Sequence, residues 1–211
     1  MRALFTCTPL YGHFLPLIPI ARAMADAGHD VAFGTPGSFR EPVETAGFRW
    51  VRAGVEDDDP ELIAVKAQHR ELQGVEQIRF GLREIMGGIR PRRLVPDLLA
   101  LAETWRPDLI VRESREFGTL IAAELLDVPY AQVQVNAAGA LPHLAAMLYE
   151  PLRHLRATFG LPDRSIQDLM DRYLVLAPFP VSLNRIGDPI AATAHHIRAL
   201  PQDGADSALP A

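Results

Sequence analysis

Two residues far apart in the sequence, His13 and Glu113, carry the clearest signal for chemistry in this chain. His13 ends a loop at 8–13 that follows an apolar run at 2–7, and Glu113 ends a similar run at 108–113. Because an imidazole titrates near neutral pH, it is well suited to take up and return a proton. A carboxylate beside it fixes its tautomer and makes it a stronger base. The two residues therefore predict general-base chemistry, provided that the fold brings them together.

The pattern of apolar residues predicts the elements that would position them. Strands are expected at 2–7, 30–35, 48–52, 108–113 and 130–135, with two short late strands at 174–177 and 195–198. Helical spacing lies between them, so the fold class is α/β, a single Rossmann-like, doubly wound, mostly parallel sheet with helices on both faces. Right-handed crossovers favour the strand order 3-2-1-4-5. Strands one and four are neighbours in that order, and their carboxyl ends border one crevice.

The intervening segments differ in how clearly they predict helices. Helical patterns cover 17–27, 38–46, 92–105, 117–126, 141–159 and 165–173. Residues 61–88 are only weakly helical and contain Gly74, Gly81, Gly87 and Gly88, so broken helices are expected there.

Composition narrows the classes of protein. The formal net charge of −5 argues against a general binder of nucleic acid or membrane surfaces. No apolar run approaches the ~18 residues of a membrane span, and the N-terminus lacks the pattern of a leader peptide. A single cysteine, Cys7, allows no intrachain disulfide, which fits a cytoplasmic protein.

The sequence lacks the motifs of a dinucleotide site, a metal site and a nucleophile elbow. No G-x-G-x-x-G cradle follows the first strand, so a dinucleotide site is not expected there. The acidic run at 56–59 has no histidine or spaced ligands beside it and is interpreted as a solvated turn, not a metal site. No nucleophile elbow occurs at Gly118 or Gly139. We therefore expect neither a metal nor a bound cofactor.

Two ordered blocks connect the sequence to a known family. They are GHFLPLIPIARAMADAGHDVAF at 12–33 and WRPDLIVRES at 105–114, the latter followed by AAE at 122–124 and VP at 128–129. The blocks resemble the N-terminal domain of GT-B glycosyltransferases, specifically the UDP-glycosyltransferase-like enzymes that decorate natural products in actinomycetes. The resemblance covers roughly residues 1–200. It implies the acceptor-binding half of such an enzyme.

The resemblance also implies roles for individual residues. The histidine at the position of His13 removes the proton from an acceptor hydroxyl, and an acidic residue at the position of Glu113 supports it. Aspartate is commoner there, so the longer glutamate leaves the geometry open, and Glu116 is close enough to serve instead. The candidate substrate-binding residues are Tyr11, Gly12, Phe80, Met86, Ser114, Glu116, Asn136, Leu141 and Met147.

The expected organisation is an acceptor-binding domain at 1–200 and a linker or disordered tail at 201–211. A nucleotide-diphosphate sugar would be a co-substrate, bound mainly by a C-terminal donor-binding domain that acts in cis or in trans. Without that domain the chain should bind a hydrophobic acceptor weakly and turn over poorly or not at all. The alternative is a non-catalytic accessory protein with the same fold. The acceptor, the sugar and the presence of a homodimer stay open.

Overall fold

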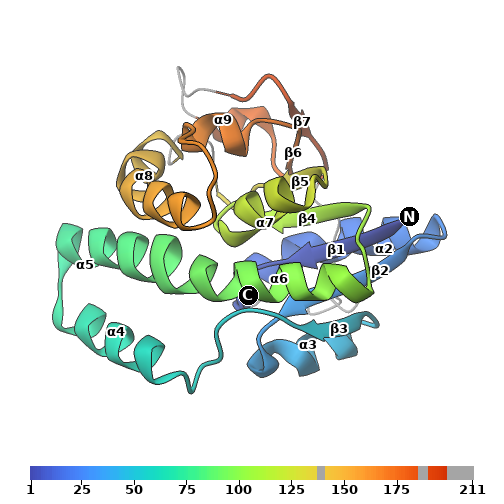
Figure 1. The fold of residues 1–211 in the computed structure, drawn as a ribbon. Helices are drawn as coiled ribbons and strands as arrows, with labels where there is room; N and C mark the ends of the chain where they lie inside the picture. The colour runs from blue at the N-terminus through green and yellow to red at the C-terminus, as the bar shows by residue number, and fades with distance from the viewer. Residues whose placement is uncertain (137–140, 185–189, 199–211) are drawn as a thin grey trace, which may run out of the picture.

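The computed structural model describes residues 1–136, 141–184 and 190–198 (Figure 1). The side chains at 141–144 are not among the described groups, although the helix that contains them is. The predicted domain boundary at residue 200 and the tail at 201–211 lie outside the described residues.

Seven parallel strands form one sheet in the order β3-β2-β1-β4-β5-β6-β7. The strands are β1 (Arg2–Thr6), β2 (Asp30–Thr35), β3 (Arg49–Arg52), β4 (Leu109–Glu113), β5 (Tyr130–Val133), β6 (Leu174–Ala177) and β7 (Ala194–His196). The predicted α/β class and the order 3-2-1-4-5 are confirmed, and the two late strands extend the sheet beyond β5. β7 begins one residue before its predicted start and stops two residues before its predicted end.

The first and fourth strands lie side by side in register. Ala3 pairs with Leu109, and Thr6 pairs with Arg112. Alternate residues of β1 enter different apolar clusters on the two faces, Leu4 on one and Phe5 on the other, and both are at most 1% exposed. Burial on both faces explains the unbroken apolar run of β1. The parallel pairing brings the carboxyl ends of β1 and β4 to one edge of the sheet.

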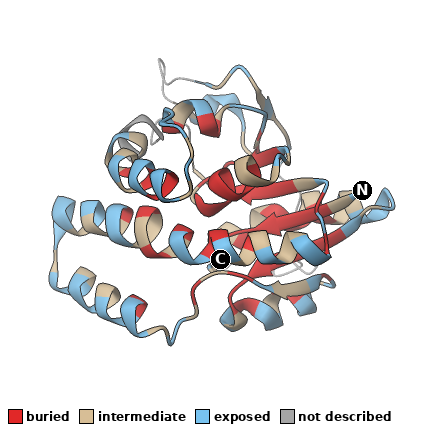
Figure 2. Cartoon of the chain, viewed as in Figure 1, coloured by how far each residue is buried: buried red, intermediate tan, exposed pale blue. Residues whose placement is uncertain are grey.

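Helices cover both faces of the sheet. The N-terminal helices α1 (Tyr11–Phe14), η1 (Leu15–Leu17), α2 (Ile18–Asp26), η2 (Gly37–Phe39) and α3 (Arg40–Thr45) contribute side chains to the cluster of Phe5. The cluster of Leu4 includes side chains of α6 (Arg90–Thr104), α7 (Gly118–Leu126), α8 (Leu141–Thr158) and α9 (Ile166–Met170). A last short helix is η5 (Val181–Leu183). Figure 2 shows buried residues concentrated along the strands and on the helix sides that face them.

The expectation of broken helices at 61–88 is only partly correct. α4 (Pro60–Glu71) and α5 (Gly74–Phe80) are separate, but α5 continues through the π-helix η3 (Gly81–Ile89) into α6 as one long rod (Figure 1). η3 packs against α8 at Gly87. A Cβ at Gly87 would lie 2.9 Å from Pro151 Cγ, so the glycine permits a close approach of the two helices.

The prediction of a loop through residue 13 is also corrected. The structure begins α1 at Tyr11, which places His13 on a short helix that runs directly into η1. Phe14 fixes this turn because its ring is 2% exposed and packs edge-on against the rings of Phe33 and Phe39. Among the described residues, no helix is long and apolar enough to cross a membrane.

Candidate active site

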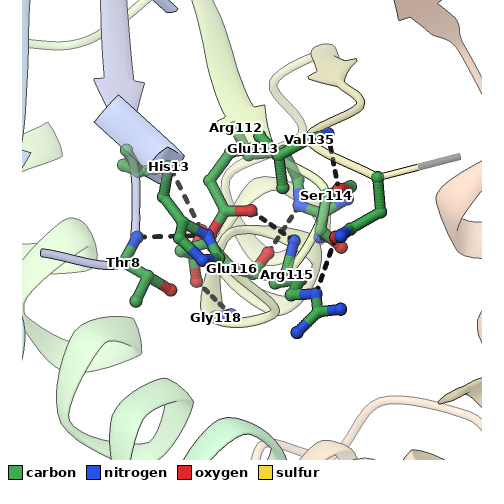
Figure 3. Close-up of polar contacts among 11 residues, drawn as sticks. Thr8, His13, Arg112, Glu113, Ser114, Arg115, Glu116, Gly118 and Val135 are labelled. Atoms are coloured by element: carbon green, nitrogen blue, oxygen red, sulfur yellow. Dashed lines mark hydrogen bonds and ion pairs between the residues drawn. The ribbon is translucent and has the colours of Figure 1, made fainter. Parts of the chain in front are cut away.

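His13 and Glu113 meet at the carboxyl edge of the sheet, as predicted (Figure 3). His13 Nδ1 lies 3.0 Å from Glu113 Oε1. The imidazole side chain is 15% exposed, whereas the carboxylate is fully buried. The histidine therefore keeps a route to solvent, and the glutamate contacts only protein groups.

The ring of His13 is close to the carboxylate but is not aligned with it. The two atoms are within hydrogen-bonding distance, yet Nδ1 makes no well-directed hydrogen bond to any described group.

Backbone amides hold the Glu113 carboxylate in place. Oε1 accepts a hydrogen bond from the Thr8 N–H at 3.3 Å, and Oε2 accepts one from the Arg115 N–H at 2.6 Å. Burial alone would raise the pKa of Glu113, but His13, the Arg115 amide and the charge of Arg112 outweigh it and hold that pKa below its ordinary value. An ionised carboxylate beside the ring is the state that supports a basic imidazole.

Glu116 does not contact His13, the role that the sequence left open for it, but binds the start of α7. One of its oxygens accepts from the Gly118 and Thr119 N–H groups at the start of α7, and the other accepts from the Thr6 hydroxyl at 3.1 Å. Burial raises the pKa of Glu116, although the charge of Arg112 opposes that shift. Glu116 thus caps a helix, and Glu113 is the carboxylate that contacts His13.

Arg112 and Ser114 shape the turn between β4 and α7. The fully buried guanidinium of Arg112 donates to the Ser114 carbonyl at 3.0 Å, to the Glu116 carbonyl and to the Gln132 side chain. Ser114 Oγ accepts from the Val135 N–H at 3.2 Å and so connects the ends of β4 and β5. Sequence reasoning missed Arg112, although a charged residue inside a buried strand was a signal that it had a structural partner.

A small cleft opens where the strands end, next to this pair, and is lined by Thr8 and Glu116 but by neither His13 nor Glu113. Its walls come from the segments that follow β1 to β4, from η3 and from the start of α6. Of the predicted residues, Met86 and Glu116 line it. Arg90 and Arg115 also line it, and sequence reasoning missed both.

The other predicted substrate-binding residues lie elsewhere or contribute indirectly. Tyr11 is 61% exposed and packs on Phe39, while Gly12 next to it faces open space. Asn136 accepts a hydrogen bond from Arg115 Nε at 2.8 Å and so positions a residue of the cleft.

Two further residues pack away from the cleft. The ring of Phe80 lies near that of His69, and Met147 packs against the apolar cluster beneath α8. The side chain of Leu141 lies outside the described groups. A role for any of these residues in substrate binding stays a prediction.

Metal ligation has no basis in the part of the chain that the structure describes. No group of three or more His, Cys, Asp or Glu side chains there could hold a metal ion.

Comparisons with known proteins agree with the fold. A family model described as the erythromycin biosynthesis protein CIII-like N-terminal domain matches residues 22–202, a range that includes Glu113 but begins after His13. The 4'-demethylrebeccamycin synthase of Lentzea aerocolonigenes is 33% identical over 138 residues, which are 64% of this chain and 32% of that protein. The L-demethylnoviosyl transferase of Streptomyces niveus is 34% identical over 144 residues, 67% of this chain and 36% of that protein. The chain thus spans about a third of these relatives' length.

Solved structures extend the match over the whole chain. The glycosyltransferase SnogD from Streptomyces nogalater superposes with a TM-score of 0.72 at 22% identity, covering 100% of this chain and 54% of its own. SsfS6 from Streptomyces sp. SF2575 gives 0.74 at 21% identity, covering 100% and 57%. These likenesses establish the architecture as the N-terminal half of a GT-B glycosyltransferase. Since the family model matches most of the sequence, the chain belongs to the family of erythromycin biosynthesis protein CIII-like N-terminal domains.

Proposed function

We propose that this chain is the acceptor-binding and general-base half of a nucleotide-sugar-dependent glycosyltransferase, acting on a hydroxyl of a hydrophobic natural product. The observation that carries the proposal is the contact of His13 with the buried carboxylate of Glu113, beside a cleft at the carboxyl ends of the strands. Open α/β sheets bind ligands at this edge.

The chemistry follows from the pair. An alcohol is a weak nucleophile until its proton moves, so a base within reach of the acceptor hydroxyl accelerates transfer. In the proposed reaction, His13 accepts that proton while the oxygen attacks the anomeric carbon of the sugar and the nucleoside diphosphate leaves. Glu113 stabilises the imidazolium that forms and does not contact the substrate itself.

The relatives support the substrate classes. Their names describe sugar transfer to microbial products, among them aklavinone and an erythronolide derivative. One solved neighbour, the rhamnosyltransferase SpnG, has been seen with thymidine diphosphate and with the spinosyn aglycone. We propose the same two substrate classes here, with no bound metal or cofactor, and a cytoplasmic location because the single Cys7 forms no disulfide.

The donor-binding half is proposed to lie beyond the residues of this chain, in the same polypeptide or in a partner. In the solved neighbours the matched region accounts for little more than half of the protein. This chain alone is therefore expected to bind an apolar aglycone weakly and a nucleotide-diphosphate sugar hardly at all. Calorimetric titration measures both, and micromolar binding of the nucleotide sugar would contradict this division of labour.

The decisive experiment compares initial rates of sugar transfer with the donor-binding half present and the donor saturating. The variant His13→Ala should lose about 10²–10⁴-fold in rate, the usual contribution of a general base. Glu113→Gln should lose less, because the base itself remains.

A matched control is His29→Ala. His29 lies at the opposite end of α2 from the cleft, with its ring near the N-terminal amine, and this variant should keep the parent rate. A His13→Ala rate within a few-fold of the parent would remove the base assignment. A non-catalytic accessory role would then describe the chain better.

A further inference from the structure

Arg90 lines the cleft, and its charged guanidinium has no partner among the residues that the structure describes. It is the first residue of α6, and its guanidinium makes no hydrogen bond or ion pair with any residue in the described ranges. Its Nε atom is fully buried and has no partner among them. Burial lowers the pKa of Arg90, although arginine stays protonated in proteins. A buried donor without a partner costs free energy, so the position is unfavourable until a ligand fills it.

The acidic groups around Arg90 are already engaged by other donors. Asp57 accepts from Lys66 Nζ at 2.8 Å. Glu113 accepts from two backbone amides and contacts His13. The oxygens of Glu116 are used by α7 and Thr6. None of these carboxylates lies within ion-pair distance of the guanidinium, which therefore remains available to an incoming anion.

A second guanidinium borders the same cleft. Arg115 donates through Nε to Asn136 Oδ1 at 2.8 Å, and this bond fixes the plane of its fork. Figure 3 shows the rest of that fork projecting away from the backbone of the β4–α7 turn, beyond the bond to Asn136. Arg90 begins α6 and Arg115 lies in the turn after β4, so the fold brings two cations from different elements to one cleft.

The remaining lining is mainly apolar. It includes Pro36, Val55, Met86, Leu94 and Phe117. A small cleft with apolar walls and two guanidinium groups fits a flat organic acid better than a fully hydrated inorganic anion, because the walls need an apolar body to cover them.

We propose that the cleft selects acceptors that carry an anionic oxygen, a carboxylate or an ionised phenol, which binds Arg90 with help from Arg115. This inference rests on the proposed function, since it adds a substrate class to the same acceptor site. The anionic group is held on the α6 side of the cleft, and the hydroxyl that receives the sugar lies on the side of His13. Arg90 thus acts in recognition, and it takes no part in proton transfer.

The test is calorimetric titration of this chain with a hydroxynaphthoic acid and, separately, with its methyl ester. The two probes share ring and hydroxyl and differ in the charge. The acid should bind about tenfold tighter or more, because a charge-assisted hydrogen bond is stronger than a neutral one. That preference should disappear in Arg90→Gln. It should remain in Arg92→Gln, a control on the same helix whose guanidinium is exposed and already paired with Glu61.

A measurement on the parent chain covers the case in which Arg90→Gln does not fold. Added salt should weaken binding of the acid and leave the ester unchanged. Equal affinity of both probes, or an acid preference that survives in Arg90→Gln, would overturn the anionic subsite and leave the acceptor cleft standing. Binding of neither probe would count against the cleft and the subsite together. Inorganic pyrophosphate that binds through Arg90 and displaces the acid would assign the guanidinium to the donor instead.

Discussion

Two buried carboxylates three residues apart, Glu113 and Glu116, should respond to acid in opposite directions. The pKa of Glu113 lies below its ordinary value, and that of Glu116 lies above it. A depressed pKa means that Glu113 stabilises the fold above the unfolded-state pKa of about 4.3, and that this contribution fades as the pH falls through the folded-state pKa. For Glu116, whose pKa is raised, the pH dependence of its contribution to stability has the opposite sign. Its contribution is complete below about pH 4.3 and fades as the pH rises through its higher folded-state pKa.

The variant Glu113→Gln gives the larger effect near neutral pH. Both carboxylate oxygens of Glu113 accept from backbone N–H groups, of Thr8 and Arg115. In either orientation the amide NH2 of a glutamine would face one of those donors, so one bond is lost and a repulsive contact replaces it. A hydrogen bond to a charged group contributes roughly 1.5–3 kcal/mol, so the free energy of unfolding should fall by about 2–4 kcal/mol.

Glu116→Gln is the matched control. Its amide oxygen can still accept from the Gly118 and Thr119 N–H groups, and its NH2 can donate to the Thr6 hydroxyl. Only the second, shared contact of the Thr119 N–H with the other oxygen at 3.2 Å is lost. Since the charged form of Glu116 is the disfavoured one, removing that charge should cost little near pH 7, under about 1 kcal/mol. The cost should then grow as the pH falls, because the parent recovers a favourable protonated acid.

Urea unfolding followed by circular dichroism at about pH 7, 5 and 4 tests both signs, since the unfolded carboxyl titrates in this range. The difference in free energy of unfolding between the parent and Glu113→Gln should shrink as the pH falls. The same difference between the parent and Glu116→Gln should grow. Two gaps that do not change with pH, or that change in the same direction, would refute the assignment of the two carboxylates.

Two further substitutions, each with a control, test a close helix contact and a buried ion pair. Gly87→Ala should destabilise the chain by about 1–2 kcal/mol, because overpacking against Pro151 and Leu148 outweighs the helix propensity of alanine, whereas Gly12→Ala, with open space around it, should not. Arg156→Met should cost about 3 kcal/mol, since the buried guanidinium donates to Glu124 and to the Pro162 carbonyl. Arg93→Met breaks two ion pairs at the surface, with Asp59 and Glu61, and should cost under ~1 kcal/mol. Thermal or urea unfolding measures all four.

The parts of the site that depend on backbone topology could be predicted from the sequence. Apolar runs located β1 and β4, and the handedness of crossovers made them neighbours. The contact between His13 and Glu113 follows from those two facts, because each residue stands at the end of its strand or just beyond it. No side-chain detail was needed for that prediction.

The parts that depend on side-chain partners could not be predicted. Arg90 follows nine residues of π-helix, and nothing in the glycine-rich, weakly helical sequence before it predicts that geometry. The place of Arg90 in the cleft could therefore not be predicted. The sequence did not identify the three acceptors of Arg112, two carbonyls of the turn and the side chain of Gln132 on β5. The contact of the exposed Tyr11 ring with Phe39 could not be predicted either, and a role of Tyr11 in substrate binding stays a prediction.

The β4–α7 turn decides which of its two glutamates contacts His13. Glu113 lies at the end of β4, next to β1, where the Thr8 amide and His13 are within reach. Glu116 follows the turn and meets the free N–H groups that begin α7, which any helix must satisfy. A carboxylate held by these N–H groups is not free to contact His13 on α1 as well. The helix thus holds Glu116, while the side chain of Glu113 is long enough to bring Oε1 within 3.0 Å of His13 Nδ1.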